Sequence, residues 1–271
     1  GFIEVGTVTP KKQLGNPKPR IFRLEKDQAM INRLGFNNDG LEIVSKRISE
    51  NPPNGILGIN IGPNKDTKNK TEDFIKCFLG MHSNADYITI NISSPNTKGL
   101  RDFHEKKYLS KLLENLCALK KRNKIKKQIF LKVSPDINNN NISDIIDLIF
   151  KYKIEGIIVS NTSDKNRESL TDKNKLEAGG LSGAPIRNLS TNLIKKFYNE
   201  TKSKISIIGV GGVDSGLATF EKISAGAKAV QLYTGMVYQG PGIVQEIKKD
   251  LIEILNKEKI KNIDNLVGIN S

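Results

Sequence analysis

Short apolar runs alternate with amphipathic segments along the whole chain, and this alternation restricts the fold more than any other feature. Seven runs have the length and composition of buried strands, at residues 2–5, 56–61, 87–92, 129–133, 156–160, 205–210 and 229–233. Between them, leucines and isoleucines recur at helical spacing, as in residues 108–119, 142–149 and 243–255. Continuously apolar strands separated by helices indicate an α/β fold with a parallel sheet that is buried on both faces.

The number of strands points to a particular barrel. A closed parallel barrel of this type needs eight strands, whereas the chain offers seven and opens with Gly1-Phe2-Ile3. We therefore expect a (β/α)8 TIM barrel that lacks its first βα unit, with residues 1–271 forming one N-terminally truncated catalytic domain. An open doubly wound sheet is the alternative. It is disfavoured because polar and glycine-rich segments follow nearly every strand and do not gather at one switch point.

Composition excludes several classes of protein. No apolar stretch approaches the roughly 20 residues that span a bilayer, and no signal peptide is present. Cys77 and Cys117 lie far apart in helix-like stretches, so we expect buried, reduced thiols. The two histidines are too few for a metal cluster. Ser190 and Ser215 are predicted to be the N-caps of two helices.

The net charge of +14 has two interpretations. A basic protein can bind nucleic acid or an anionic membrane surface. The lysines are scattered through most predicted helices, however, which favours generally solvated faces. The densest run, residues 120–127, falls at the end of a predicted helix, where cations complement the helix dipole. In a barrel, this run would lie on the face opposite the active site.

The most informative segment is residues 91–101, Asn-Ile-Ser-Ser-Pro-Asn-Thr-Lys-Gly-Leu-Arg, which follows a predicted buried strand. Its amides and hydroxyls suit the binding of a small polar substrate beside a reactive hydroxyl. Ser94 is the candidate base, with Ser93 as its rival, and either serine would need a positioned proton acceptor. Four asparagines at or just beyond strand ends predict an amide-lined pocket: Asn60, Asn91, Asn96 and Asn161.

A lysine and three glycine-rich segments suggest a phosphorylated, electron-accepting cofactor. Lys132 lies inside a predicted strand, where it either extends to the rim or provides a fixed cation beside an electron-rich ring such as a reduced flavin. Residues 208–213 and 231–235 end the last two strands, where barrels of this type bind phosphate. Residues 179–183 lie in a predicted long loop. This segment is either a flexible hinge or a further backbone contact with the cofactor.

Taken together, nine motifs resemble those of the class 2, quinone-linked dihydroorotate dehydrogenases, and they cover nearly the whole chain: residues 4–10, 15–20, 32–38, 58–62, 91–101, 160–162, 179–183, 209–212 and 233–235. The class 1 enzymes resemble this chain less, because they carry a cysteine at the position of Ser94. Where the family often has a proline, this chain has Lys98. Ser160 replaces a common threonine but keeps the hydroxyl.

The resemblance implies a barrel that binds FMN and oxidises (S)-dihydroorotate to orotate in pyrimidine (UMP) biosynthesis, with a quinone as electron acceptor. By analogy, Ser94 removes a proton from C5 of the substrate while a hydride passes from C6 to flavin N5. The residues that would bind FMN are Thr7, Asn60, Asn91, Lys132, Ser160, Gly183, Gly212, Tyr233 and Thr234. The residues that would bind the substrate are Asn32, Arg33, Leu34, Gly35, Phe36, Asn91, Asn96, Asn161 and Thr162.

The family also has N-terminal helices that lie on the membrane and form the quinone tunnel, and this sequence lacks them. The resemblance therefore implies a peripheral enzyme at the cytoplasmic face of the inner membrane, with the missing N-terminus providing the membrane contact. We expect the chain alone to be inactive, because an open barrel leaves two unpaired strand edges.

Two other functions are considered. A tRNA dihydrouridine synthase would use the basic charge to bind RNA, but it needs a cysteine acid, and residues 91–101 contain no cysteine. A non-catalytic barrel-like binding protein is disfavoured by the chemical groups that follow all seven predicted strands. We therefore expect no nucleic-acid partner.

Overall fold

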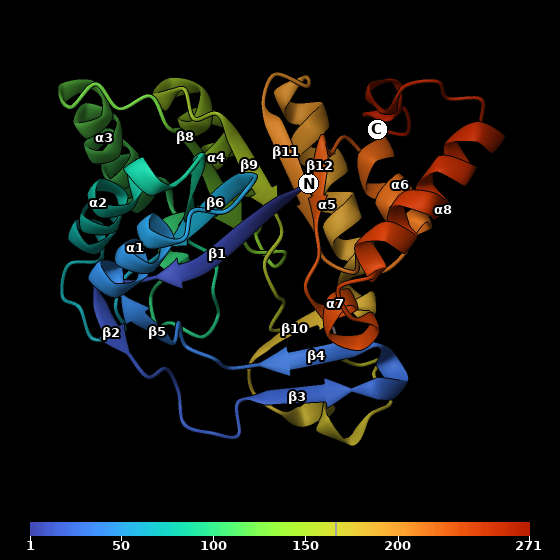
Figure 1. Ribbon diagram of the computed structural model, residues 1–271, viewed down its shortest axis with the longest axis horizontal. Helices are drawn as coiled ribbons and strands as arrows, with labels where there is room; N and C mark the ends of the chain where they lie inside the picture. The colour runs from blue at the N-terminus through green and yellow to red at the C-terminus, as the bar shows by residue number, and fades with distance from the viewer. Residues whose placement is uncertain (166) are drawn as a thin grey trace. The chain divides into compact units, whose positions relative to one another are not determined.

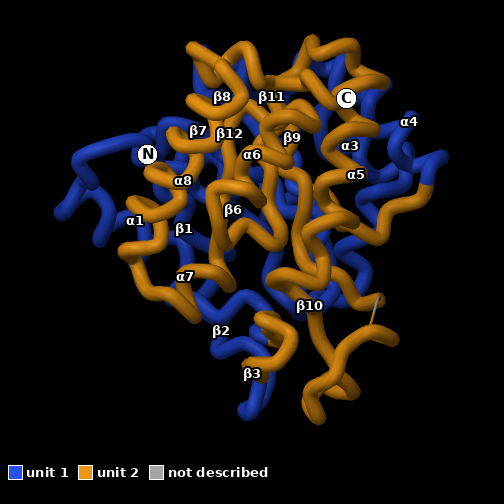
Figure 2. The backbone as a smooth tube through the Cα atoms, turned by 90° about the vertical axis from the view of Figure 1, so that its right-hand side faces the viewer, with its two compact units in different colours: residues 1–20, 34–132, 139–155 blue, residues 21–33, 133–138, 156–271 orange. Residues whose placement is uncertain are grey.

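The computed structural model describes residues 1–165 and 167–271 (Figure 1). The chain forms two compact units, shown in different colours in Figure 2. Unit 1 comprises residues 1–20, 34–132 and 139–155, and unit 2 comprises residues 21–33, 133–138 and 156–271. The expectation that residues 1–271 act as a single domain stays a prediction.

Unit 1 is built on parallel strands with helices between them. The strands are β1 (Phe2–Val8), β6 (Ile56–Ile61), β7 (Tyr87–Asn91) and β8 (Gln128–Val133), and each pairs with the next in this order. The helices are α1 (Leu41–Glu50), α2 (Lys70–Met81), α3 (Lys106–Arg122) and α4 (Asn139–Tyr152), with short 3-10 turns at His82–Asn84 and Arg101–His104. A small antiparallel pair, β2 (Lys11–Gln13) and β5 (Asn38–Gly40), completes this unit.

The core of unit 1 follows directly from the apolar pattern. Ile59, Ile61, Ile88 and Ile90 of the central strands are fully buried. The buried stripe of α3 consists of the leucines that recur at helical spacing, Leu109, Leu112, Leu113 and Leu116. The basic run begins in the last turn of α3 and precedes β8, so it lies at the amino ends of the strands, as expected.

Unit 2 contains the other parallel strands, β9 (Gly156–Val159), β11 (Ser206–Val210) and β12 (Ala229–Gln231), with β11 pairing to both others. Its helices are α5 (Arg187–Thr201), α6 (Gly216–Ser224), α7 (Thr234–Gln239) and α8 (Ile243–Lys257). Its 3-10 turns are Glu25–Asp27, Lys173–Leu176, Ala184–Ile186 and Ile263–Leu266. A separate antiparallel sheet has the order β10 (Gly180–Gly183), β4 (Ala29–Asn32), β3 (Ile21–Leu24).

The prediction of a long loop at residues 179–183 is wrong. Most of this segment is strand β10, which pairs antiparallel with β4, so that Gly183 faces Ala29. The glycines allow close approach of two backbones, because a Cβ at Gly183 would lie 2.4 Å from the carbonyl oxygen of Gln28. The glycine-rich segment is therefore part of a sheet and does not form a hinge.

Of the two predicted N-caps, one is correct. The Ser215 hydroxyl accepts a hydrogen bond from the backbone N–H of Ala218 at 3.2 Å, as an N-cap should. Ser190 instead lies inside α5, which begins at Arg187, and its buried hydroxyl bonds to the carbonyl of Val210 on β11. Tertiary contact with the neighbouring strand determines the environment of this serine.

Two other features of composition can be compared with the structure. Cys77 and Cys117 are free thiols, as expected, although Cys117 is only half-buried. Within residues 1–165 and 167–271, no helix combines the length and hydropathy that a membrane span requires.

Candidate active site

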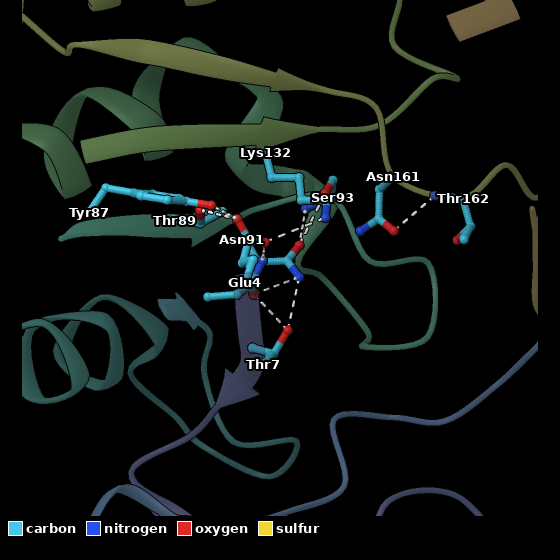
Figure 3. Close-up of polar contacts among 10 residues, drawn as sticks. Glu4, Thr7, Tyr87, Thr89, Asn91, Ser93, Lys132, Asn161 and Thr162 are labelled. Carbon is cyan, nitrogen blue, oxygen red and sulfur yellow. Dashed lines mark hydrogen bonds and ion pairs between the residues drawn. The ribbon is translucent and has the colours of Figure 1, made fainter. Parts of the chain in front are cut away.

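A network of polar side chains occupies the carboxyl ends of β1, β6 and β7 in unit 1 (Figure 3). The Thr7 hydroxyl donates to Asn60 Oδ1 at 2.7 Å. Asn91 Nδ2 donates to Thr7 Oγ1 at 3.1 Å and to Asn60 Oδ1 at 3.2 Å. The backbone N–H and the hydroxyl of Ser93 both donate to Asn91 Oδ1, at 3.2 and 3.0 Å. Asn60, Asn91 and Ser93 are buried and Thr7 is half-buried. Because these groups are bonded to one another, the fold fixes their orientations.

Glu4 connects this network to the interior of unit 1, and the sequence analysis did not single it out. Its Oε1 accepts a hydrogen bond from Asn60 Nδ2 at 3.0 Å and lies 3.6 Å from Lys132 Nζ. Its Oε2 accepts from Tyr87 Oη at 3.1 Å and from Thr89 Oγ1 at 2.9 Å. One carboxylate on β1 therefore holds side chains from β6, β7 and β8, as Figure 3 shows for the labelled residues.

Lys132 is a paired cation. Its side chain is 17% exposed and that of Glu4 is 10% exposed, so most of both charged groups is removed from water. A charge in such a position requires a partner of opposite sign. Lys132 was selected because it is a charged residue inside an apolar strand. Glu4, in the predicted strand 2–5, has the same feature and could have been identified in the same way.

Ser94, the predicted base, lies in the loop after β7 and is 6% exposed. Its Oγ accepts a hydrogen bond from the backbone N–H of Asn96 at 3.3 Å. Arg101 Nε donates to the carbonyl of Ser93 at 3.2 Å, so both ends of the loop are tied together. The bond from Asn96 uses a lone pair of the Ser94 oxygen and leaves the orientation of its hydroxyl hydrogen unconstrained by that contact.

The predicted substrate segment 32–36 is divided between the units. In unit 1, Asn16 N donates to the carbonyl of Leu34 at 3.0 Å, and Gln13 Nε2 donates to those of Gly35 and Phe36 at 3.1 and 3.0 Å. Gly35 and Phe36 both have positive φ, at 73° and 54°. The side-chain amide of Gln13 therefore stabilises a turn that a non-glycine residue rarely adopts.

The remaining residues of this segment lie in unit 2. Asn32 ends β4, and Arg33 follows it. Arg33 pairs with Glu177, with 2.7 Å between Nη1 and Oε2, and its guanidinium lies 4.5 Å from the centre of the Phe22 ring. The guanidinium is thus held by both a carboxylate and an aromatic face.

Three predicted ligand-binding residues follow β9 in unit 2. The backbone N–H of Ser160 donates to the carbonyl of Val210 at 3.0 Å, and that of Asn161 donates to the carbonyl of Val133 at 2.9 Å. The N–H of Thr162 is bonded to Asn161 Oδ1 at 2.8 Å, as Figure 3 also shows. These bonds place the three residues at the carboxyl end of a parallel strand, where α/β folds bind ligands.

The glycine-rich strand ends of unit 2 have close-packed backbones. Gly212 has φ of 69°, and a Cβ there would lie 2.7 Å from Arg187 Cβ. A Cβ on Gly183 would lie 3.0 Å from Thr234 Cγ2, and Thr234 Oγ1 donates to Ser182 Oγ at 2.8 Å. Tyr233 precedes α7 and is 62% exposed. Of the predicted FMN residues, the structure brings Thr7, Asn60, Asn91 and Lys132 into one network in unit 1, and Gly183 and Thr234 into contact in unit 2.

His104, in the 3-10 turn of the same loop as Ser94, is a buried titratable group outside the predicted site. Burial lowers its pKa to about 4, and the charge of Arg101 contributes to this shift. Among the described residues, its Nε2 has no hydrogen-bond partner. We therefore conclude that this imidazole is neutral at pH 7.

Acidification should destabilise the folded chain through His104. Its folded-state pKa lies below the unfolded value of 6.5. The unfolded state therefore binds the extra proton, and the free energy of unfolding falls as the pH drops from 6.5 toward 4. The loss attributable to this residue should reach about 3 kcal/mol.

Urea unfolding at pH 7 and at pH 4.5 measures this loss in the free energy of unfolding. The His104→Gln variant should lose less stability on acidification than wild type. Equal slopes for wild type and His104→Gln would contradict the assignment.

Comparison with known proteins identifies the family. A family model described as dihydroorotate dehydrogenase matches residues 1–255. The chain belongs to the dihydroorotate dehydrogenase family. The dihydroorotate dehydrogenase (quinone) of Rhizobium etli is 45% identical and covers 97% of this chain and 74% of that protein. The protein of the same name from Bartonella tribocorum is 44% identical, with the same coverage.

Solved structures confirm the predicted fold. The chain is similar to ligand-free DHODH from Eimeria tenella, with a TM-score of 0.94 and 39% identity over 98% of this chain and 81% of that one. DHODH from the same organism in complex with ferulenol gives a TM-score of 0.93 and 39% identity, over 99% of this chain and 78% of that one. Together with the seven parallel strands, this likeness to dihydroorotate dehydrogenases confirms an α/β fold of the TIM-barrel type with seven strands.

Proposed function

We propose that the chain oxidises (S)-dihydroorotate to orotate with bound FMN, and that a quinone accepts the electrons, in de novo pyrimidine (UMP) biosynthesis. The observation that supports this function best is the buried network of Glu4, Thr7, Asn60, Asn91 and Lys132 at the strand ends of unit 1. The quinone assignment is supported by the relatives, which are named dihydroorotate dehydrogenase (quinone).

The donor set of the site fits FMN. A flavin ring presents carbonyl and N–H groups, and the amides of Asn60 and Asn91 can both donate and accept hydrogen bonds. Lys132 supplies a cation suited to negative charge near N1 and O2. In unit 2, the Gly211-Gly212 turn, with φ of 117° and 69°, has no Cβ atoms to keep a phosphate group from its backbone N–H groups. Ser160, Gly183, Tyr233 and Thr234 complete the proposed FMN contacts. When bound, FMN supplies the hydride acceptor.

The substrate is an anionic ring that also presents carbonyl and N–H groups. Asn91, Asn96, Asn161 and Thr162 offer amides and a hydroxyl for that ring. Arg33, with the neighbouring residues 32–36, offers positive charge for the carboxylate. In this proposal Ser94 Oγ takes the proton from C5 of the substrate while its own hydroxyl proton passes to a water molecule, since it is a buried hydroxyl in the loop that follows β7.

The location follows from the acceptor. Membrane quinones are lipid-soluble, so an enzyme that reduces them must approach the bilayer. We therefore propose a peripheral enzyme on the cytoplasmic face of the inner membrane. A float assay with liposomes that contain anionic lipid tests whether the residues of this chain take part in the membrane contact, because a chain that stays with the soluble fraction at low salt would show that they do not.

Anaerobic flavin reduction tests the proposed reaction. If the proposed function holds for this chain, the purified protein, loaded with FMN, should lose its absorption band near about 450 nm when dihydroorotate is added, because the flavin accepts the hydride. Bleaching would then show that the expectation of an inactive chain is wrong. Addition of a short-chain quinone should restore the band. A bound flavin that dihydroorotate does not bleach would exclude this substrate. Failure to bind FMN at all would exclude the proposed cofactor.

A further inference from the structure

Lys222 is a fully buried cation that the proposed reaction does not use. It lies on α6 in unit 2, and its Nζ donates to Ser190 Oγ at 3.1 Å, to Thr191 Oγ1 at 3.2 Å and to the carbonyl of Arg187 at 3.5 Å. These three partners belong to the first turns of α5 and are neutral oxygens. Burial, together with the neighbouring charge of Arg187, lowers the pKa of Lys222 to about 7. Burying an ammonium group among neutral oxygens costs free energy. An apolar side chain would fill the same space without that cost, so the lysine is expected to have a further role.

The first connection from Lys222 leads to the start of the glycine turn. The Ser190 hydroxyl, which accepts from Lys222, is also bonded to the carbonyl of Val210, the residue before Gly211. A Cβ on Gly211 would lie 3.1 Å from Ser190 Cβ, and one on Gly209 would lie 3.2 Å from Lys222 Cδ. The lysine side chain therefore lies directly behind the end of β11.

The second connection leads to the end of the turn. Arg187, whose carbonyl accepts from Lys222, donates from its Nε to the carbonyl of Gly212 at 3.1 Å. The Arg187 guanidinium also pairs with Asp214. Lys222 is thus joined through one intermediate residue to each side of the Gly211-Gly212 turn, and α5 packs against both β11 and α6.

We propose that Lys222 is a positioning residue for the phosphate group of FMN. It fixes the Gly211-Gly212 turn through Ser190 and Arg187 and, in its ammonium form, places a positive charge behind the turn. This inference rests on the proposed function, since it concerns the phosphate end of the proposed cofactor. A phosphate monoester carries close to two negative charges at pH 7, and a buried cation interacts with it strongly because little water screens the pair.

The dissociation constants of FMN and of riboflavin, which lacks the phosphate, separate this role from a packing role. For Lys222→Met, we expect FMN binding to weaken by about 10- to 100-fold, the range for a lost interaction with a charged group. Riboflavin binding should stay within about 2-fold of wild type, because the ring contacts are in other residues. Flavin fluorescence measures both constants in the full chain. The exposed Lys228, close to the end of α6, gives the control variant Lys228→Met, which should keep the wild-type preference for FMN.

The outcomes are distinct. If Lys222→Met retains the wild-type preference for FMN over riboflavin, or if it weakens both ligands equally, the inference is overturned. If Lys222→Met does not fold, Ser190→Ala decides, because it removes the connection to Val210 and keeps the lysine. It should reduce the preference for FMN, and an unchanged preference would overturn the inference. If dihydroorotate bleaches the flavin of the wild-type protein but the variant keeps the wild-type preference for FMN, only the role of Lys222 is rejected, and the proposed function stands. Wild-type protein that binds no FMN would reject both proposals.

Discussion

Ser94→Ala should lower the rate of flavin reduction by dihydroorotate by about 10²- to 10⁴-fold, the range for loss of a general base. The expected loss is confined to proton removal from C5. FMN affinity should change little, because the recorded bond of the Ser94 side chain goes to the backbone of Asn96 and not to the Thr7, Asn60 and Asn91 network. Anaerobic stopped-flow absorbance at saturating substrate measures the reduction rate directly.

Ser93→Ala is the matched control, since Ser93 was the rival candidate for the base. This variant removes a hydrogen bond to Asn91 Oδ1, so it should weaken FMN binding more than it slows the reduction of flavin that is bound. The reverse pattern, with Ser94→Ala within about threefold of wild type and Ser93→Ala unable to reduce flavin, would assign the base to Ser93.

Glu4→Gln should lower the free energy of unfolding by about 3 kcal/mol, the lower end of the range for breaking a buried ion pair from one side. The substitution keeps the size of the side chain but leaves the mostly buried Lys132 without its counter-charge. It also replaces an acceptor of the Tyr87 and Thr89 hydroxyls with an amide. Urea unfolding of the apoprotein at pH 7 measures the change. Glu42→Gln, on an exposed position of α1, is the control and should fall within about 0.5 kcal/mol of wild type.

A double-variant cycle isolates the ion pair. If Glu4 acts mainly through Lys132, Glu4→Gln should cost less in a Lys132→Met background than in wild type, because no buried cation is then left unpaired. Strictly additive losses would show that the Glu4–Lys132 contact contributes nothing and that Glu4 acts only through its hydrogen bonds to Asn60, Tyr87 and Thr89.

Local sequence predicts the parallel strands well because burial on both faces leaves a continuous apolar signature. Residues 56–61 are predicted and observed as the same strand, and helix α3 extends the expected leucine stripe by only a few residues. Strand ends are less well predicted. β1 continues to Val8 through polar and glycine residues, and β12 stops at Gln231, since the pairing with neighbouring strands determines where each strand ends.

The pairing of β10 with β4 in the antiparallel sheet of unit 2 was not predicted, because these two strands are distant in sequence. The other pair of this sheet, β3 and β4, is close in sequence, but neither segment was predicted to be a strand. Leu181 faces Ile31, and neither segment carries a hairpin signal that would connect the two. For Ser190, the local preference for an N-cap gave the wrong answer, since the residue is buried against β11. Both errors have the same cause, which is that long-range contacts override local preference.

Two kinds of argument produced the candidate site. Ser94, Lys132 and the four asparagines follow from polar or charged residues in or just beyond predicted strands, whereas most of the other site residues follow only from the resemblance to the family. Lys132 was recognised in this way and is indeed paired, whereas Glu4 was overlooked because its motif was read only for its resemblance to a family. The roles of the individual residues in binding and catalysis stay predictions.

The amide of Asn91 already makes as many hydrogen bonds as its chemistry allows. Its two hydrogens go to Thr7 and Asn60, and its oxygen accepts twice from Ser93. A ligand can therefore gain a hydrogen bond to this amide only by displacing one that exists, and the exchange is close to neutral in enthalpy. Asn91 should discriminate between ligands by weakening the binding of the wrong one. A molecule that displaces a protein partner of Asn91 without replacing the hydrogen bond leaves a buried polar group unsatisfied. Asn91 should therefore lower the affinity of a mismatched ligand more than it raises the affinity of a matched one.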